Sequence, residues 1–220
     1  MKAADRNSIR DRLARLRVVP VLRFSARSEA EAAIDCLLKA GYGSVEITLT
    51  TPGAVELIAA LRARTAKEFL VGAGTVLDLT SAQHCIDAGA DYLVSPCLVP
   101  GLAAHAHAAG RGALLGGFTP GEVWAAWREG ADIVKVFPAA TGGPSHLSAL
   151  RAVYPQIPLC PTGGVSLENM GEYFRAGAWI VGVGNNVIDK TALATGDRAA
   201  VIGHAKRFLD LARDSAGARG

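Results

Sequence analysis

Short apolar runs rich in branched residues alternate along the chain with longer segments rich in alanine and leucine. Apolar runs of roughly four to eight residues are typical of strands buried on both faces of a parallel sheet, whereas the longer segments have apolar residues at helical spacing. The pattern predicts eight strands, over residues 18–24, 44–50, 69–74, 91–96, 112–117, 132–138, 157–163 and 179–184.

Helices are predicted between these strands, for example over residues 28–41, 79–90 and 166–178. Gly41 ends the first of them, as glycine commonly does after the last helical turn. The other two also close on glycine. We expect Thr80 or Ser81 to cap the second helix and Ser166 to cap the third, because a hydroxyl oxygen can accept a hydrogen bond from a free amide of the first turn.

Strand–helix units that repeat about every two dozen residues predict an α/β fold of the (β/α)8 TIM-barrel type. Residues 5–16 predict an extra N-terminal helix before the first strand. No linker or change of composition divides the chain, so we expect one barrel domain over residues 1–220. A doubly wound open sheet is the alternative, since periodicity does not show closure. Polar or glycine residues along one face of four strands favour the barrel, whose interior opens into a site.

Composition and charge exclude some classes of function. Half of the residues are hydrophobic, a fifth are charged, and the net charge is +3. This charge is too small to indicate a nucleic-acid or membrane partner. No apolar stretch is long enough for a signal peptide or a membrane helix, which predicts a soluble, cytoplasmic protein. The four cysteines are widely spaced and form no C-x-x-C pair, which is typical of reduced core residues.

Two charged residues occur on strands that are otherwise apolar. Side chains two residues apart share a face of a strand, and the outer face of a barrel strand packs against helices. In strand 44–50 the apolar face is Val45, Ile47 and Leu49, so Glu46 belongs to the barrel interior. The same argument places Lys135, in the run "DIVKVFP", inside the barrel.

A buried lysine and a buried glutamate have a structural and a chemical interpretation. They can form an ion pair that locks the barrel, or the lysine can extend from the strand end to water. Alternatively, desolvation lowers the pKa of an ammonium group, and the free amine can attack a ketone to form a Schiff base. Such an imine withdraws electrons, so a neighbouring carbon–carbon bond can break. Glu46 would then move the protons for Lys135.

Glycine loops follow several of the predicted strands. Gly163 and Gly164 come directly after the seventh strand, and the turn "GVGNN" at 182–186 follows the eighth. Loops in these two places bind phosphate in many barrels, through backbone N–H groups. Each loop alone is equally explained as a simple turn. Thr75 lies at the mouth of the third strand, and Arg23 lies at the rim after the first.

The motifs "VEITL", "GAGTVL", "SP", "VKVFPA" and "CPTGGV" occur in this order along the chain. In this order and spacing they closely resemble the 2-keto-3-deoxy-6-phosphogluconate (KDPG) and 4-hydroxy-2-oxoglutarate aldolase family, over roughly residues 10–210. The resemblance implies a (β/α)8 barrel that forms a homotrimer and needs neither metal nor cofactor. It also implies a class I aldolase that cleaves a phosphorylated 2-keto-3-deoxy sugar acid into pyruvate and glyceraldehyde 3-phosphate.

The resemblance also assigns roles to residues. It implies that Lys135 forms the Schiff base and that Glu46 is the general acid/base. The positions that match the pyruvate pocket are Thr75, Pro96, Phe137 and Thr162. The positions that match the phosphate side are Gly163 and Gly164, with Gly184 in the "GVGN" turn beside them.

Two departures from the family pattern concern the substrate. Thr50 stands where members that act on the gluconate substrate have an arginine that binds the carboxylate. Arg23 is the candidate replacement for this arginine, and "LRF" resembles the "LRG" of the galactonate-phosphate aldolases. Alternatively, Arg23 is a solvated charge at the rim of the barrel or part of a structural ion pair. Asn185 stands where serine contacts phosphate, and asparagine can still donate a hydrogen bond. The gluconate epimer, the galactonate epimer and 4-hydroxy-2-oxoglutarate all remain open as substrates.

The remaining candidate chemistry is unremarkable. The five histidines include no H-E-x-x-H motif and no clustered carboxylates, so no metal site is expected.

Two rival functions remain. A non-catalytic barrel that binds a phosphorylated metabolite would need the glycine loops but no interior lysine. A sugar-phosphate isomerase would need acid/base residues but no imine.

Overall fold

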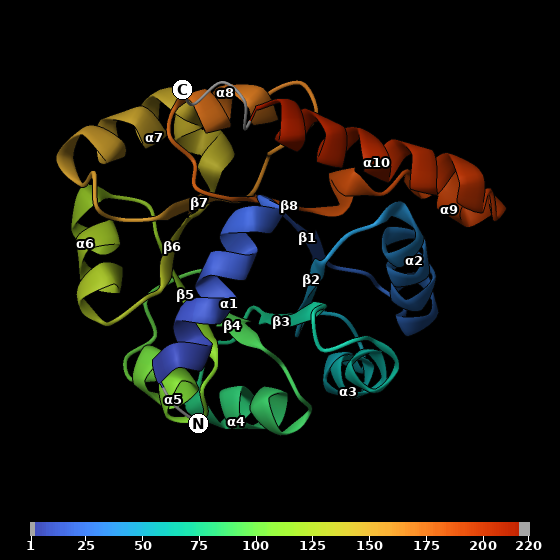
Figure 1. The fold of residues 1–220 in the computed structure, drawn as a ribbon, viewed down its shortest axis with the longest axis horizontal. Coiled ribbons are helices and arrows are strands. Elements are labelled where there is room, and N and C mark those ends of the chain that lie inside the picture. Colours follow the sequence, from blue (N-terminus) through green and yellow to red (C-terminus); the bar gives the residue numbers. More distant parts are fainter. Residues whose placement is uncertain (1–2, 216–220) are drawn as a thin grey trace.

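The computed structural model describes residues 3–215, in which eight strands surround one axis and helices cover them from outside (Figure 1). The strands are β1 Val18–Leu22, β2 Ser44–Thr48, β3 Leu70–Gly74, β4 Tyr92–Val94, β5 Gly112–Gly117, β6 Ile133–Val136, β7 Leu159–Pro161 and β8 Val181–Val183. All eight predicted strands are present. Most are shorter than predicted, because residues at one or both ends of the apolar runs lie in loops; β1, β2, β4, β6, β7 and β8 end before the predicted last residue.

The helices alternate with the strands. They are α1 Ala3–Leu16, α2 Arg27–Ala40, α3 Ala54–Arg64, α4 Leu79–Asp87, α5 Leu102–Ala108, α6 Pro120–Arg128, α7 Ala139–Val153, α8 Met170–Arg175, α9 Lys190–Thr195 and α10 Arg198–Asp214. A short 3-10 turn, η1 Asn185–Val187, follows β8. The predicted N-terminal helix is therefore confirmed as α1. Among the described residues, no helix has both the length and the apolar character needed to cross a membrane.

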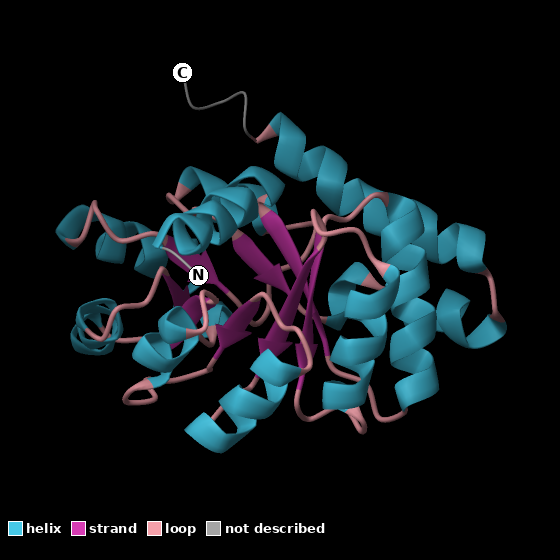
Figure 2. Cartoon of the chain, turned by 60° about the horizontal axis from the view of Figure 1, so that its bottom comes forward, coloured by secondary structure: helices cyan, strands magenta, loops and turns pink. Residues whose placement is uncertain are grey.

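The sheet is parallel throughout, in the order β7-β6-β5-β4-β3-β2-β1-β8 (Figure 2). Its two ends meet at a bridge between Thr162 and Gly182, and the Trp179 N–H donates to the carbonyl of Leu159 at 2.9 Å. The prediction of a (β/α)8 barrel is thus confirmed, and the open-sheet alternative is wrong. Because β7 and β8 pair only briefly, this is the weakest seam of the barrel.

Helix ends follow the predictions in part. Gly41 is the C-cap of α2, with a left-handed φ of 94°, as predicted. The predicted caps of the other two helices are wrong. α4 begins one residue before Thr80, and the carboxylate of Asp78 accepts a hydrogen bond from the Ser81 N–H at 2.7 Å. α8 begins at Met170, so Ser166 precedes it by a full turn.

Two apolar layers hold the barrel together. The outward-facing Val45 and Ile47 are fully buried against the helices, as predicted. Inside the barrel, a second cluster joins Ile9 and Leu13 of α1 to Tyr92 and its neighbours from other strands. α1 lies across the amino-terminal opening of the barrel (Figure 1) and therefore plugs it.

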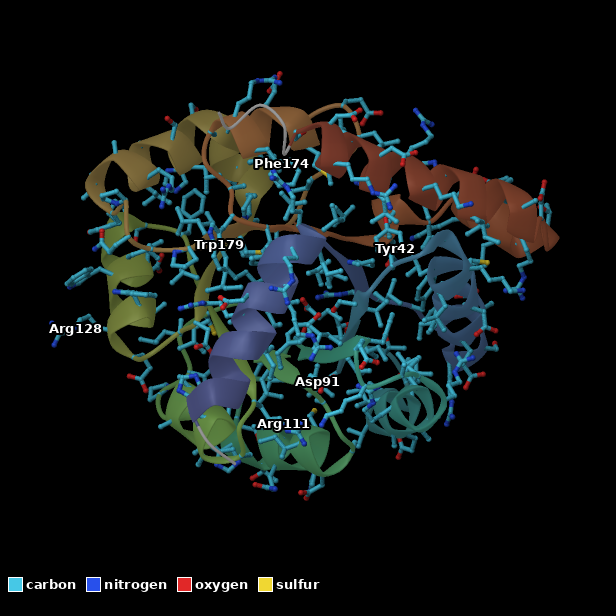
Figure 3. The ribbon with its side chains drawn as sticks, viewed as in Figure 1. Tyr42, Asp91, Arg111, Arg128, Phe174 and Trp179 are labelled. Atoms are coloured by element: carbon cyan, nitrogen blue, oxygen red, sulfur yellow. The ribbon has the colours of Figure 1, made fainter. Side chains whose placement is uncertain are left out.

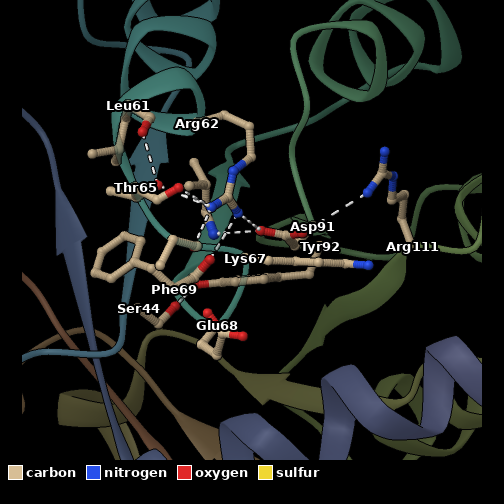
Figure 4. A network of polar contacts seen from close by, with 12 residues as sticks. Ser44, Leu61, Arg62, Thr65, Lys67, Glu68, Phe69, Asp91, Tyr92 and Arg111 are labelled. Carbon is tan, nitrogen blue, oxygen red and sulfur yellow. Dashed lines mark hydrogen bonds and ion pairs between the residues drawn. The ribbon is translucent and has the colours of Figure 1, made fainter.

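Ion pairs surround this closed end. Figure 3 shows Asp91 and Arg111 beside α1 at the amino ends of β4 and β5. Arg62 of α3 donates to Asp91 Oδ2 at 3.0 Å and to the carbonyl of Phe69 at 2.8 Å, and Arg111 Nη1 lies 3.8 Å from Asp91 Oδ1 (Figure 4). Since the amino-terminal face of such barrels serves stability rather than catalysis, this network ties strands and helices together away from the site.

Candidate active site

The carboxyl ends of the strands surround a pocket of about 250 Å³. Eight of the residues predicted for the site line it: Arg23, Thr75, Lys135, Phe137, Thr162, Gly163, Gly184 and Asn185. They belong to segments of β1, β3, β6, β7 and β8 that are distant in sequence, so the barrel brings together what the chain separates. Four predicted residues are outside this lining: Glu46, Thr50, Pro96 and Gly164.

Lys135 and Glu46 face each other across the barrel interior. Lys135 is 5% exposed and Glu46 is 3% exposed, as the alternation of β6 and β2 predicts. Lys135 Nζ lies 4.0 Å from Glu46 Oε1 and 5.4 Å from the centroid of the Phe137 ring. A direct hydrogen bond between nitrogen and oxygen would be about 2.9 Å long. The gap therefore leaves room for the carboxylate to serve a group attached to the lysine.

The environment of Glu46 favours proton transfer. Burial raises the pKa of its carboxyl group above the ordinary value, while the charges of Lys135 and Arg23 oppose this rise. Oε1 is buried and has no hydrogen-bond partner among the described residues. Cys160 lies beside Lys135 in the sheet, and burial raises the pKa of its thiol to about 12, so it stays neutral. Glu46 is thus the acidic group placed to exchange a proton beside Lys135.

Glycines in the strands make room for the polar side chains. A Cβ atom at Gly74 of β3 would lie 2.0 Å from Glu46 Oε1, and one at Gly182 of β8 would lie 2.3 Å from Thr162 Oγ1. These glycines are adjacent to the site residues in the sheet rather than in the sequence. The sequence analysis gave Gly74 no role of its own, because that role depends on the register between β2 and β3.

Arg23 follows β1 directly and stands at the rim. Its Nη2 atom lies 3.5 Å from Thr75 Oγ1, and its backbone exchanges two hydrogen bonds with the side-chain amide of Asn185. Thr75 has a left-handed φ of 60°. Such a conformation costs a β-branched residue about 1–3 kcal/mol and is typically maintained only where the surroundings enforce it, often at functional sites.

Thr50 is exposed in the turn after β2 and does not line the pocket. Its hydroxyl lies 2.8 Å from that of Thr48, which lines the pocket and donates to the carbonyl of Leu22 at 2.9 Å. Thr48 is a pocket residue that the sequence analysis did not name, although it lies on the same face of β2 as Glu46. Pro96 is half-buried after β4, and its backbone packs against Gly116.

The loop after β7 has two consecutive left-handed residues, Gly163 with φ 89° and Gly164 with φ 87°. A Cβ atom at Gly163 would lie 3.0 Å from the Phe137 ring, and one at Gly164 would lie 2.4 Å from Ala140 Cβ. Both positions therefore require glycine. Gly184 lies opposite them with φ −64°, and no atom lies within 4 Å of the position of a Cβ there.

The described residues include no group of three histidine, cysteine, aspartate or glutamate side chains that could hold a metal ion. The histidines take part in other contacts. His107 Nε2 lies 2.9 Å from Asp132 Oδ2, and the His146 ring stacks on Phe118 with 4.5 Å between centroids.

Comparison with known proteins agrees with this geometry. The family model for KDPG and KHG aldolases matches residues 9–203. A 2-dehydro-3-deoxy-phosphogluconate aldolase of Treponema pallidum is 33% identical over 93% of this chain and 97% of its own length. A probable 2-dehydro-3-deoxy-6-phosphogalactonate aldolase of Rhizobium meliloti is 33% identical over 82% of this chain and 85% of its own.

Among solved structures, the KDPG aldolase of Legionella pneumophila, with pyruvate captured as a covalent carbinolamine, superimposes with a TM-score of 0.81 at 27% identity. The match covers 90% of this chain and 96% of the Legionella chain. The fold is therefore that of a KDPG aldolase barrel.

Proposed function

The chain belongs to the KDPG and KHG aldolase family, and from this premise we propose that it is a class I aldolase that cleaves 2-keto-3-deoxy-6-phosphogluconate. The products are pyruvate and glyceraldehyde 3-phosphate. The observation that carries the proposal is the pair of Lys135, which lines the pocket, and Glu46, which lies behind it in the barrel interior; both are buried, with 4.0 Å between Nζ and Oε1. A metabolite-binding barrel needs no interior lysine–glutamate pair, and a sugar-phosphate isomerase needs acid/base residues but no imine.

In the proposed reaction, the free amine of Lys135 attacks the C2 ketone of the substrate and water leaves, which gives an imine. Glu46 accepts the proton of the C4 hydroxyl, the C3–C4 bond breaks, and its electrons flow to the protonated imine nitrogen. The aldehyde departs, C3 of the enamine is protonated, and hydrolysis of the imine releases pyruvate. No metal or cofactor takes part, since the protonated imine is the electron sink.

We assign the rest of the pocket by charge and position. Arg23 binds the substrate carboxylate, because a guanidinium can grip a carboxylate with two N–H groups. Pyruvate contacts are assigned to Thr75, Pro96, Phe137 and Thr162. The phosphate is assigned to the backbone amides around Gly163, Gly164 and Gly184, with Asn185 beside them. The left-handed glycines after β7 support this assignment, because they let a ligand approach the backbone closely.

Borohydride trapping tests the proposal. Incubation with pyruvate and borohydride should add a stable mass to the protein, and peptide mapping should find it on Lys135. Lys135→Arg should retain the charge and the fold but form no adduct. Lys190→Arg is the matched control, since Lys190 is exposed and lies near the barrel mouth. An adduct on Lys39, Lys67 or Lys190 would show that Lys135 is not the nucleophile.

The galactonate epimer is the second candidate substrate. Arg23 reaches the pocket while Thr50 does not, which is the departure expected for the galactonate-phosphate enzymes. Parallel measurements of kcat/KM with both epimers and with 4-hydroxy-2-oxoglutarate separate the candidates. The preferred substrate is the one with the highest kcat/KM.

We also propose that residues 1–220 form a single domain, that the enzyme is cytoplasmic, and that it assembles as a homotrimer. Exposed leucines after β3 support self-association, since Leu77 in the loop is 54% exposed and Leu79 at the start of α4 is 42% exposed. Sedimentation equilibrium should give the mass of three chains. A mass of one chain over the working concentration range would refute the trimer.

A further inference from the structure

Three side chains hold the backbone where β1 ends and the pocket begins. The hydroxyl of Thr48 donates to the carbonyl of Leu22 at 2.9 Å, and the N–H of Phe24 donates to Thr51 Oγ1 at 3.2 Å. Both come from the β2 side. From the β8 side, the Arg23 N–H donates to Asn185 Oδ1 at 3.1 Å, and Asn185 Nδ2 donates to the Arg23 carbonyl at 2.5 Å.

The Asn185 amide acts as a substitute for a strand residue. The β1–β8 ladder has its last register pair at Pro20 and Val183, and proline offers no N–H. β8 then ends, so its backbone forms no ladder pair with Arg23. A carboxamide has one acceptor oxygen and a donor nitrogen, like a peptide group. The side chain of Asn185 therefore continues the pairing and satisfies both polar groups of Arg23.

This pairing decides where the Arg23 side chain lies. Arg23 and Asn185 both line the catalytic pocket and a second pocket of about 450 Å³, formed largely by residues of α2 and α9. Glu29 lines the second pocket and would attract a guanidinium. The hydrogen bond from the Arg23 side chain to Thr75 is 3.5 Å long, at the limit for such a bond, so the backbone position is the stronger constraint.

We propose that Asn185 is a positioning residue that holds Arg23 over the catalytic pocket and so sets the affinity for the substrate carboxylate. This inference rests on the proposed function of Lys135 and Arg23. It gives Asn185 a task beyond phosphate contact and accounts for asparagine in place of serine. A serine hydroxyl offers a single atom on a shorter side chain, which does not span the N–H and the carbonyl of Arg23.

The test compares pyruvate with its methyl ester, which keeps the ketone but lacks the carboxylate charge. Adduct formation in the presence of borohydride is measured over a range of concentrations of each compound. In Asn185→Leu, half-saturation by pyruvate should rise about 10-fold, within the range for coupled neighbouring residues. Half-saturation by the methyl ester should not change. In an Arg23→Ala background, Asn185→Leu should add no further change.

Two further variants separate positioning from general damage. Asn185→Ser should also raise half-saturation by pyruvate, and it tests the inference if the leucine variant fails to fold. Asn186→Leu is the matched control, because Asn186 lies on the same turn but donates to the carbonyl of Val165 instead. Its response to both compounds should be that of the unmodified protein.

Three results would overturn the inference. The first is a change of pyruvate and methyl ester half-saturation by the same factor in both Asn185 variants. The second is an unchanged pyruvate response together with weaker inhibition by inorganic phosphate, which would leave phosphate binding as the role of Asn185. The third is a full effect of Asn185→Leu in the Arg23→Ala background. If the unmodified protein forms no adduct with pyruvate, the proposed function itself fails, which is a separate outcome.

Discussion

A methyl group added at Gly74 should separate catalysis from folding. In Gly74→Ala, the new Cβ atom would lie 2.0 Å from Glu46 Oε1, 2.8 Å from Cδ and 2.9 Å from Cγ. Real Cβ atoms essentially never come closer than 3.0 Å to another heavy atom. The carboxylate must therefore retreat by about 1 Å, a displacement that can cost on the order of 10²-fold in rate when it affects a reacting group.

Stability should change much less than rate. The atoms that clash belong to the end of the Glu46 side chain, which can rotate, and Gly74 lacks the left-handed φ that would strain alanine. We therefore expect kcat for aldol cleavage to fall about 100-fold while the melting temperature stays close to that of the unmodified protein. Pyruvate should still be trapped on Lys135 by borohydride, because the amine is not displaced.

The control is Gly203→Ala, since no atom lies within 4 Å of the position of a Cβ at Gly203 in α10. Its kcat should not change. The decisive measurement is Gly74→Ala in a Glu46→Gln background, where the displaced group no longer transfers protons. There the added methyl should cost little further activity, because residues that act as a unit are not additive. Unchanged kcat in the single variant Gly74→Ala would refute the placement of Glu46 beside the reacting atoms.

Further predictions concern the charges of the site. Glu46→Gln should lower kcat by about 10²–10⁴-fold with the fold intact, as loss of a general acid/base typically does. If the variant retains the kcat of the unmodified protein, Glu46 takes no part in the mechanism. Because burial raises the pKa of Glu46 above its ordinary value of 4.5 and only its ionised form accepts a proton, kcat/KM should fall with decreasing pH through a midpoint above 4.5. Arg23→Ala removes a charge that lowers this pKa, so the midpoint should move to higher pH. Arg23→Ala should also lower kcat/KM by about 10–150-fold, and adding Thr50→Arg should restore part of it. If Arg23→Ala has the kcat/KM of the unmodified protein with every 2-keto acid, Arg23 is only a charged residue at the rim of the barrel.

The sequence predicts the strands and the buried pair of Glu46 and Lys135, because both depend on local periodicity. The inward direction of Glu46 and Lys135 follows from the apolar residues beside them, and both are buried as expected. The pattern fails at the carboxyl ends of the strands. Thr50 and Pro96 continue the alternation of their strands, but the backbone there has left the sheet, and neither residue lines the pocket.

The local alternation of apolar and polar residues does not predict contacts between segments that are distant in the sequence. The hydrogen bonds from Asn185 to Arg23 join residues 162 positions apart. The space that Gly74 gives to Glu46 depends on the register of two strands. The wrong helix caps have a more local cause, since several polar residues near a helix start can compete, and Asp78 is a stronger acceptor than the hydroxyls that follow it.

The amino end of the barrel stabilises the fold, and the carboxyl end holds the candidate active site. At the amino end, α1 and the fully buried Tyr92 fill the interior, and the Tyr92 hydroxyl lies 2.9 Å from Ser44 Oγ. At the carboxyl end, the fold maintains features that each destabilise it, namely the buried Glu46 Oε1, which has no hydrogen-bond partner in the described part of the chain, left-handed Thr75 and glycine-rich loops. Since a protein has only about 5–15 kcal/mol of net stability, these features require the tight packing of the opposite end. The reactive pair therefore depends on residues that never approach the substrate.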